Sequence, residues 1–360
     1  MFVKKLVATG LAILVTVGLT ACDPPMPPEL LAAQAEKSVT CVDGDLTVAT
    51  PLALSDVVDG WASSLTGACA GSTMTKLEAD DDSAQAVISM DGQISPKCTP
   101  FATFPIAIDG GVIAYVLADA PTLNLTPQNI QDIFSGKVTN WSDPSLAAAN
   151  PDAVLPDLAI NVVGQPQQIA VDALTTWFKS LDVDFKPTLA KISAKDDGAY
   201  LATMAEGDIS ITSFSNALYA FSTVAAVTVG KDPGVDSAIA DISGIQRGAD
   251  LTGVAPGEGA APAYAATYPI NIYLCGADNL TARAIGRYLI RQDSQGSLGS
   301  AVVAPLPESV RLKAIAVVEK GLPKPKTRAS PLTSQRSARQ VSSASCRRSM
   351  ASRKRSIDCN

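Results

Sequence analysis

Strand-like and helix-like segments alternate almost throughout the body of this chain, and that alternation restricts the folds open to it. Asp45–Thr50 alternates polar and apolar residues as a strand does, and Ser55–Leu65 then places apolar residues at helical spacing. Phe104–Leu117 is read as two strand-like runs broken by the turn-forming residues 109–111, and Tyr268–Leu274 is another β-rich run. The pattern predicts an α/β architecture.

The first residues indicate export. Two lysines precede the apolar run Leu6–Leu19, which is short for a membrane span but typical of a signal peptide. The run ends in Leu-Thr-Ala-Cys, which resembles the bacterial lipobox. We therefore expect residues 1–21 to be a signal peptide, Cys22 to carry a lipid, and residues 22–40 to form a Pro-rich tether. This places the protein in the cell envelope, anchored to the outer face of the cytoplasmic membrane; an uncleaved anchor helix with a free thiol at Cys22 is the alternative.

Charge divides the chain into an acidic body and a basic tail. Residues 321–360 hold ten of the 28 Lys and Arg residues and one of the 35 Asp and Glu residues, so residues 1–320 carry a net charge of −16. So acidic a body is a poor match for nucleic acid. The tail, rich in Ser and Arg, is expected to be disordered. A basic arm for cell-wall polymers or anionic lipids, and a shifted reading frame, are the alternatives.

Four cysteines of the body, Cys41, Cys69, Cys98 and Cys275, predict two disulfides in an exported protein, with three possible connectivities. Four buried free thiols are the alternative. The chain has no His and no Cys-x-x-Cys pair, which argues against a metal site. It also lacks a Gly-x-Ser-x-Gly elbow and a Walker-type loop. We therefore expect a protein that is not an enzyme and that has no cofactor.

The most informative segment is Leu125–Pro144 (LTPQNIQDIFSGKVTNWSDP). Thr126 is expected to cap a helix that has Pro127 at its first position and ends before Gly136. The apolar stripe expected to be buried consists of Ile130, Ile133 and Phe134. The Asn-Trp-Ser-Asp-Pro sequence that follows predicts a turn with one aromatic anchor.

This segment resembles the stretch that marks phosphate-binding proteins of bacterial phosphate ABC importers, in which Ile-Phe-x-Gly-Lys-x-Thr-x-Trp-x-Asp-Pro follows a helix opened by Leu-Thr. Tyr268–Ile272 and Ala304–Val310 fall in the order expected of that family, and the likeness covers residues 45–320. The resemblance implies a two-lobed periplasmic-binding-protein fold of type 2, with two crossover strands and a central cleft for the solute.

The resemblance also implies where the lobes lie. The crossings are expected near residues 108–115 and 263–272. Lobe 1 would then comprise residues 41–108 and 272–320, and lobe 2 residues 115–262. In this arrangement Cys41 is expected to pair with Cys69, because the two flank neighbouring strands, and Cys98 with Cys275, because both lie where the crossings converge in lobe 1.

The three loops that bind the anion in this family are altered here. A tetrahedral oxyanion needs N–H and hydroxyl donors, usually with an Arg. The first loop, residues 49–54, retains one hydroxyl. The second loop, residues 79–85, contains three consecutive Asp, which we interpret as a solvated helix start. The third loop, Gly164–Asp172, has amides in place of the Arg and hydroxyls. The candidate ligand-binding residues are Thr50, Ser83, Gln165, Gln167 and Gln168.

The resemblance implies a lipoprotein that captures a solute in an interlobe cleft and delivers it to an ABC permease complex. A small polar or anionic solute is expected, phosphate by resemblance, but the altered loops predict that phosphate is not bound tightly. The alternative is a non-transport lipoprotein that uses the same fold as a binding or scaffold module for another ligand.

Overall fold

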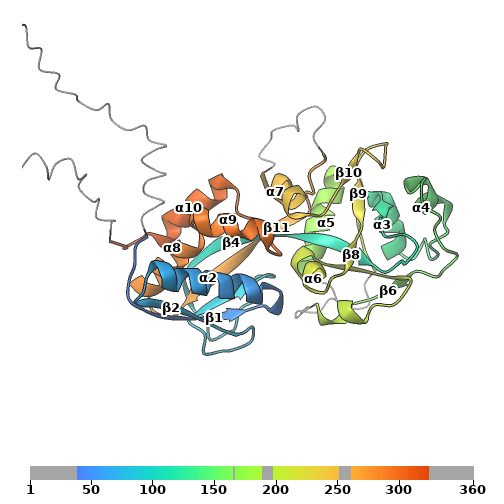
Figure 1. Ribbon diagram of the computed structural model, residues 1–360. Coiled ribbons are helices and arrows are strands. Elements are labelled where there is room, and N and C mark those ends of the chain that lie inside the picture. The colour runs from blue at the N-terminus through green and yellow to red at the C-terminus, as the bar shows by residue number, and fades with distance from the viewer. Residues whose placement is uncertain (1–38, 165–166, 189–197, 251–260, 324–360) are drawn as a thin grey trace, which may run out of the picture. The chain divides into compact units, whose positions relative to one another are not determined.

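Most strands described in this chain join one mixed β-sheet (Figure 1). The computed structural model describes residues 39–164, 167–188, 198–250 and 261–323. The sheet order is β2-β1-β3-β11-β4-β7-β6 with β8 paired to β4, and a small second sheet has the order β10-β9-β5. The longer strands are β1 (Gly44–Thr50), β2 (Ser72–Glu78), β3 (Ala86–Ser89), β4 (Pro100–Tyr115), β7 (Asp208–Ser213) and β11 (Thr267–Cys275). The shorter strands are β5 (Asn124–Leu125), β6 (Asn161–Val162), β8 (Thr223–Val224), β9 (Ala226–Thr228) and β10 (Ser237–Ala238).

Helices pack against both ends of this sheet, so the predicted α/β architecture is confirmed. The longer helices are α2 (Ser55–Ala68), α3 (Pro127–Phe134), α5 (Gln168–Ser180), α7 (Ile242–Asp250), α8 (Leu280–Leu289) and α10 (Glu308–Val318). The shorter ones are α4 (Pro144–Ala149), α6 (Phe214–Tyr219), α9 (Gln292–Gly296), and the 3-10 turns η1 (Leu52–Leu54), η2 (Ala199–Thr203) and η3 (Ser297–Ser300).

Two lobes can be recognised by which helices cover which strands. In lobe 1, α2 packs against β2, α8 against β1, and α10 against β4. In lobe 2, α5 and α6 pack against β4 and β7, and α7 packs against β4 and β11. The predicted residue boundaries of the two lobes remain a proposal.

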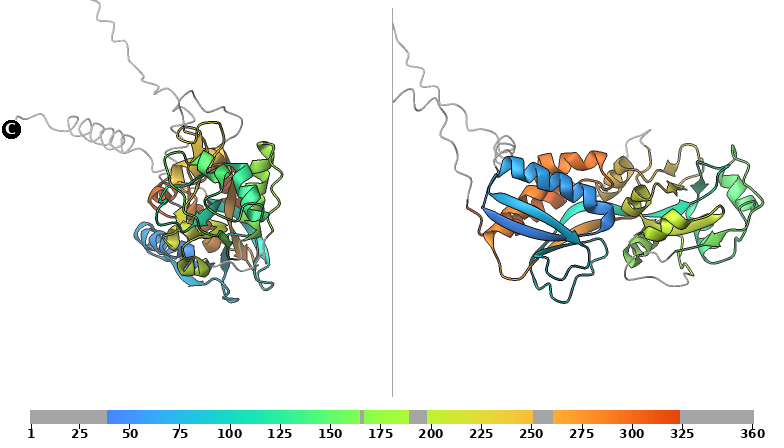
Figure 2. Two further views of the ribbon diagram at one scale, coloured as in Figure 1. Left: turned by 90° about the vertical axis from the view of Figure 1, so that its right-hand side faces the viewer. Right: turned by 60° about the horizontal axis from the view of Figure 1, so that its bottom comes forward.

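β4 and β11 pass side by side between the lobes (Figures 1 and 2). β4 pairs with β11 as far as Gly110 and with β7 from Gly111 onward, so it is one continuous strand. The prediction of two runs broken at residues 109–111 was wrong. A Cβ on Gly111 would lie 2.3 Å from the carbonyl oxygen of Ala170, so the glycine permits α5 to pack closely on the strand and does not mark a turn.

The central helix matches its prediction closely. Thr126 caps α3, its hydroxyl accepting the Asn129 N–H at 3.0 Å, and Pro127 is the first residue. The predicted stripe of Ile130, Ile133 and Phe134 is buried. The following turn is anchored by Trp141, which is fully buried and donates from Nε1 to the Gly207 carbonyl at 3.0 Å. Local capping signals thus placed this element correctly.

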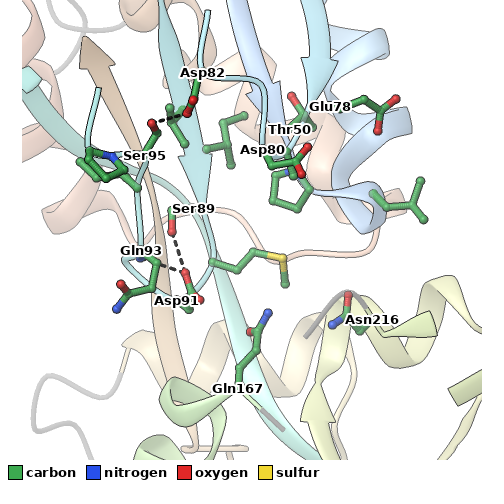
Figure 3. A pocket seen from close by; sticks show the side chains of 18 residues that line it. Thr50, Glu78, Asp80, Asp82, Ser89, Asp91, Gln93, Ser95, Gln167 and Asn216 are labelled. Atoms are coloured by element: carbon green, nitrogen blue, oxygen red, sulfur yellow. Dashed lines mark hydrogen bonds between the residues drawn. The ribbon is translucent and has the colours of Figure 1, made fainter. Parts of the chain in front are cut away.

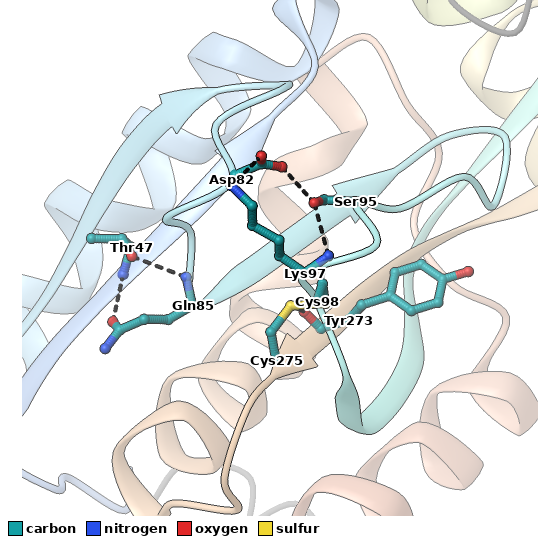
Figure 4. The surroundings of a disulfide bond; sticks show 8 residues. All are labelled: Thr47, Asp82, Gln85, Ser95, Lys97, Cys98, Tyr273 and Cys275. Atoms are coloured by element: carbon teal, nitrogen blue, oxygen red, sulfur yellow. Dashed lines mark hydrogen bonds and ion pairs between the residues drawn. A yellow bond between two sulfur atoms is a disulfide. The ribbon is translucent and has the colours of Figure 1, made fainter.

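Both predicted disulfides are present: Cys41 is bonded to Cys69, and Cys98 to Cys275. Figure 4 shows the second bond joining the segment before β4 to the end of β11. It therefore ties together two strands that are neighbours in the sheet but distant in the sequence, as the crossing arrangement predicted.

Several sequence-based predictions fall outside the described residues. They are the signal peptide (1–21), the lipidated Cys22, most of the tether (22–40), and nearly all of the basic tail. Within the described ranges, no helix is long and apolar enough to cross a membrane.

Candidate functional site

A cleft of about 730 Å³ opens between the ends of the lobe 1 strands and two helices of lobe 2 (Figure 3). Its size is typical of a site for a small molecule. Most of the lining comes from lobe 1, and Gln167 and Asn216 line it from lobe 2. The lobe 1 residues of the lining are Thr50, Pro51, Leu52, Glu78, Ala79, Asp80, Asp82, Val87, Ile88, Ser89, Met90, Asp91, Gln93, Ile94, Ser95 and Pro96.

The lobe 1 wall is built at the carboxyl ends of three parallel strands. β1 pairs in parallel with β2 and with β3, so Thr50 at the end of β1 lies opposite Glu78 at the end of β2. Ser89 ends β3. Loops that follow such strand ends converge at one edge, where open α/β sheets commonly bind ligands.

Residues 79–85 form turns that connect β2 to β3, so the prediction of a helix start there was wrong. Asp81 Oδ1 accepts both the backbone N–H and the hydroxyl of Ser83, at 2.8 and 2.6 Å, which closes the turn locally. These two hydrogen bonds lower the pKa of Asp81. Residues 79–85 must cross over β1 to connect β2 with β3, and this short segment leaves too few residues for a helix.

The lining is strongly acidic. Four carboxylates, those of Glu78, Asp80, Asp82 and Asp91, belong to it, and the lining identified in the described residues contains no Lys or Arg. Lys97 pairs with Asp82 at 2.7 Å from outside the lining. Hydrogen bonds from Lys97 and Ser95 lower the pKa of Asp82, so this carboxyl stays ionised.

Asp91 follows β3 and is held by neutral donors. Its Oδ1 accepts the hydroxyl of Ser89 and the backbone N–H of Gln93, both at 2.9 Å (Figure 3). Further along the same segment, Cys98 is fixed to Cys275 of β11. The disulfide therefore anchors the end of the loop, residues 90–98, that supplies Asp91 to the cleft.

The lobe 2 wall presents neutral amides. Gln167 is the N-cap residue of α5, and Asn216 lies in α6. Asn216 is 3% exposed; its backbone N–H donates to the capping hydroxyl of Ser213 at 3.1 Å, while its Nδ2 makes no hydrogen bond. Figure 3 shows both amides on the side of the cleft that faces Asp91 and Thr50.

The predicted ligand-binding residues fall into three groups. Thr50 and Gln167 line the cleft. Ser83 and Gln168 are not among the lining residues: the Ser83 hydroxyl bonds Asp81, and the Gln168 amide donates to Asp172 at 2.6 Å. Gln165 lies outside the described residues. Ligand contact by any of the five remains a prediction.

Sequence reasoning missed Glu78, Ser89, Asp91 and Asn216 as lining residues. A usable signal existed for the first three, because Glu78 and Ser89 each end a strand that β1 pairs with in parallel, and Asp91 follows the second of these strands by two residues. Asn216 offered none, since it enters the cleft only through the packing of α6.

Among the described residues, no group of three or more Asp, Glu, Cys or His side chains converges closely enough to hold a metal ion. The acidic residues of the cleft are therefore spread along its wall, and do not form a cage around one point.

The chain resembles known phosphate-binding proteins over parts of its length. It is 38% identical over 95 residues to the phosphate-binding protein PstS of Xylella fastidiosa, covering 26% of this chain and 23% of that protein. It is 33% identical over 91 residues to PstS of Pasteurella multocida, covering 24% and 26%. These alignments span about a quarter of either relative.

Among solved structures, a crystal structure of a DING protein is similar with a TM-score of 0.52 at 13% identity, covering 79% of this chain and all of that one. An ancestral soluble variant of the human phosphate binding protein gives a TM-score of 0.51 at 14% identity, covering 76% and 93%. At such identity these similarities establish the fold. A family model described as a PBP superfamily domain matches residues 47–292, which contain both crossing strands and every lining residue of the cleft, so the chain belongs to the periplasmic-binding-protein superfamily.

Proposed function

We propose that this protein is the solute-binding subunit of an ABC importer, working outside the cytoplasmic membrane. The observation that carries the proposal is the cleft itself, which is lined from both lobes and lies beside the two strands that join them. Closure of two lobes on a solute would bury it, and a closed liganded form is what a permease can recognise. The fold family and the names of the relatives support this reading.

A lipid on Cys22 would keep the protein near its permease, through the Pro-rich tether that follows. Changing Cys22→Ala should release the protein from the membrane fraction without altering its ability to bind solute. Retention of that variant in the membrane fraction would contradict the lipid anchor and leave the binding function untouched.

Blocking the cleft tests solute capture. Leu52 lines the cleft and is 51% exposed, so Leu52→Trp narrows the site without disturbing the core. Leu312 on α10 is also 51% exposed and lies outside the lining, so Leu312→Trp is the matched control. A solute that raises the Tm of the wild type and of the control, and not that of Leu52→Trp, is the expected result.

The screen should include inorganic phosphate, neutral sugars, amino acids and organic cations. If none of them raises Tm, or if Leu52→Trp responds like the control, the cleft is not a solute site.

The altered loops favour a second candidate, a binding module without a transporter. Loss of uptake of the identified solute on deletion of the gene supports the importer, and unchanged uptake supports the second candidate.

A further inference from the structure

We propose that the cleft takes a small organic cation that also carries a hydrogen-bonding polar group. This inference rests on the proposed solute-binding function and names the chemical class of the solute. It is carried by the charge of the lobe 1 wall, by the apolar side chains that line the same cleft, and by an amide of lobe 2.

The charge of the lobe 1 wall is the first observation. Of its four carboxylates, Asp82 is balanced by Lys97, whereas Glu78 and Asp91 make no ion pair within the described part of the chain. Both of Asp91's hydrogen-bond donors are neutral. An anion placed here would meet uncompensated negative charge, whereas a cation would supply the missing partner.

Apolar side chains belong to the same lining as these charges. Val87, Ile88 and Met90 line the same cleft as Glu78 and Asp91 and are largely buried. Such surface suits the carbon skeleton of an organic solute and offers nothing to a hydrated inorganic ion. The carboxylates of the described residues also do not converge as metal ligands do. The wall therefore fits an ammonium or guanidinium group on a carbon chain.

Asn216 is the second, independent observation. Its side chain reaches the cleft from the opposite lobe, is 97% buried, and has an Nδ2 without a hydrogen-bond partner. The Ser213 cap is satisfied by the backbone N–H of Asn216, so the helix does not use the amide. A buried amide N–H without a partner is satisfied when a ligand supplies a hydrogen-bond acceptor. The ligand thus has a cationic part for lobe 1 and a neutral or anionic polar part for lobe 2.

Matched pairs of probes test this class by calorimetry at neutral pH and low salt. The cations are L-arginine, agmatine and ethanolamine, and each is paired with a counterpart that carries one positive charge fewer: L-citrulline, N-carbamoylputrescine and ethylene glycol. We expect at least one cation to bind at least about tenfold more tightly than its counterpart, with an affinity that falls as salt is added. Equal binding within every pair, or tighter binding of the less positively charged members or of phosphate, would overturn the inference.

Variants locate the interaction. Asp91→Asn and Glu78→Gln should each weaken binding of that cation about tenfold. Asp119→Asn, which removes an exposed carboxylate outside the lining, should leave it unchanged. Asn216→Ala should weaken binding while leaving the unliganded protein at least as stable as the wild type, because the buried Nδ2 of Asn216 has no hydrogen-bond partner in the fold. A loss of stability with unchanged affinity would assign Asn216 to the fold and contradict its ligand role.

The same screen separates this inference from the proposed function. A neutral or anionic solute whose binding is abolished by Leu52→Trp and kept by Leu312→Trp would refute the cationic class and leave solute capture standing. Absence of binding by every solute tested would remove both.

Discussion

The hydroxyl of Ser215 donates a 2.6 Å hydrogen bond to the carboxylate of Asp109, and both side chains are fully buried where β4 passes between the lobes. The other carboxylate oxygen accepts the backbone N–H of Gly110 at 2.8 Å and that of Ser215 at 3.2 Å. The bond joins a crossing strand to α6, the helix that carries Asn216 into the cleft. The buried junction between the lobes is therefore held by hydrogen bonds that all end on one ionisable group, the carboxylate of Asp109.

Asp109 should make stability depend on pH. Burial raises its pKa to about 6, against the hydrogen bonds from Ser215 and Gly110 that lower it. Between the ordinary Asp value and about pH 6 the folded protein keeps a proton that the unfolded chain has lost. The stabilisation from this group is thus complete below about pH 4 and is lost as pH rises to about 6, a change of about 3 kcal/mol.

Asp109→Asn removes this dependence, since the amide imitates the protonated acid. The measurement is urea unfolding of both proteins at pH 4, 5, 6 and 7. The difference in unfolding free energy between the variant and the wild type should shift by about 3 kcal/mol in favour of the variant from pH 4 to pH 7. Parallel pH profiles for the two proteins would mean that the pKa of Asp109 is not raised.

Gly111 should be intolerant of substitution. A Cβ there would lie 2.3 Å from the Ala170 carbonyl oxygen, which belongs to the backbone of α5 and cannot easily move. We expect Gly111→Ala to cost about 1–3 kcal/mol of unfolding free energy. The control is Gly60→Ala in α2, where a Cβ meets no atom within 4 Å, and this change should stabilise by about 0.5–1 kcal/mol. Equal effects of the two changes would show that α5 does not press on the crossing strand.

These glycines also show where sequence reasoning fails. Gly110 and Gly111 were read as a break because glycine usually marks turns. The strand continues because the packing of α5 requires a residue without a side chain, which is tertiary information. Thr126 and Pro127 were read correctly because a helix cap is settled by residues next to each other in the chain.

The candidate site shows the same division. The acidic loops could be located because they follow recognisable strands, yet residues 79–85 were assigned a helix start that the short path from β2 to β3 does not allow. Asp91 and Asn216 are separated by well over a hundred residues and meet at one cleft only through the order of strands in the sheet. No local sequence pattern predicts that Asp91 and Asn216 line the same cleft.

The two disulfides should contribute unequally. Cys41–Cys69 spans 28 residues, whereas Cys98–Cys275 spans 177. If each bond acts by restricting the unfolded chain, loop-closure entropy gives about 4 kcal/mol for the short loop and about 5 kcal/mol for the long one. Urea unfolding of the two double Cys→Ser variants should therefore show Cys98→Ser/Cys275→Ser to be less stable by about 1–2 kcal/mol. A greater loss in Cys41→Ser/Cys69→Ser would favour a local structural role for the shorter loop.

Inorganic phosphate should bind weakly or not at all. Tight recognition of this anion needs several donors, and each hydrogen bond to a charged group contributes about 1.5–3 kcal/mol. Micromolar affinity corresponds to about 8 kcal/mol. The described lining contains no Lys or Arg, and its Thr50, Ser89 and Ser95 hydroxyls already donate to protein oxygens, which is enough to remove most of that affinity. Glu78 and Asp91 would in addition repel the anion.

Calorimetric titration of the wild type with phosphate at neutral pH is the direct measurement, and we expect no binding below the millimolar range. The double change Glu78→Gln with Asp91→Asn should strengthen whatever residual binding exists, because it removes two negative charges from the lining, whereas Asp119→Asn should not. Sub-micromolar binding of phosphate by the wild type would overturn this prediction and indicate that the chain binds phosphate as an importer subunit does, with donors supplied outside the lining described here.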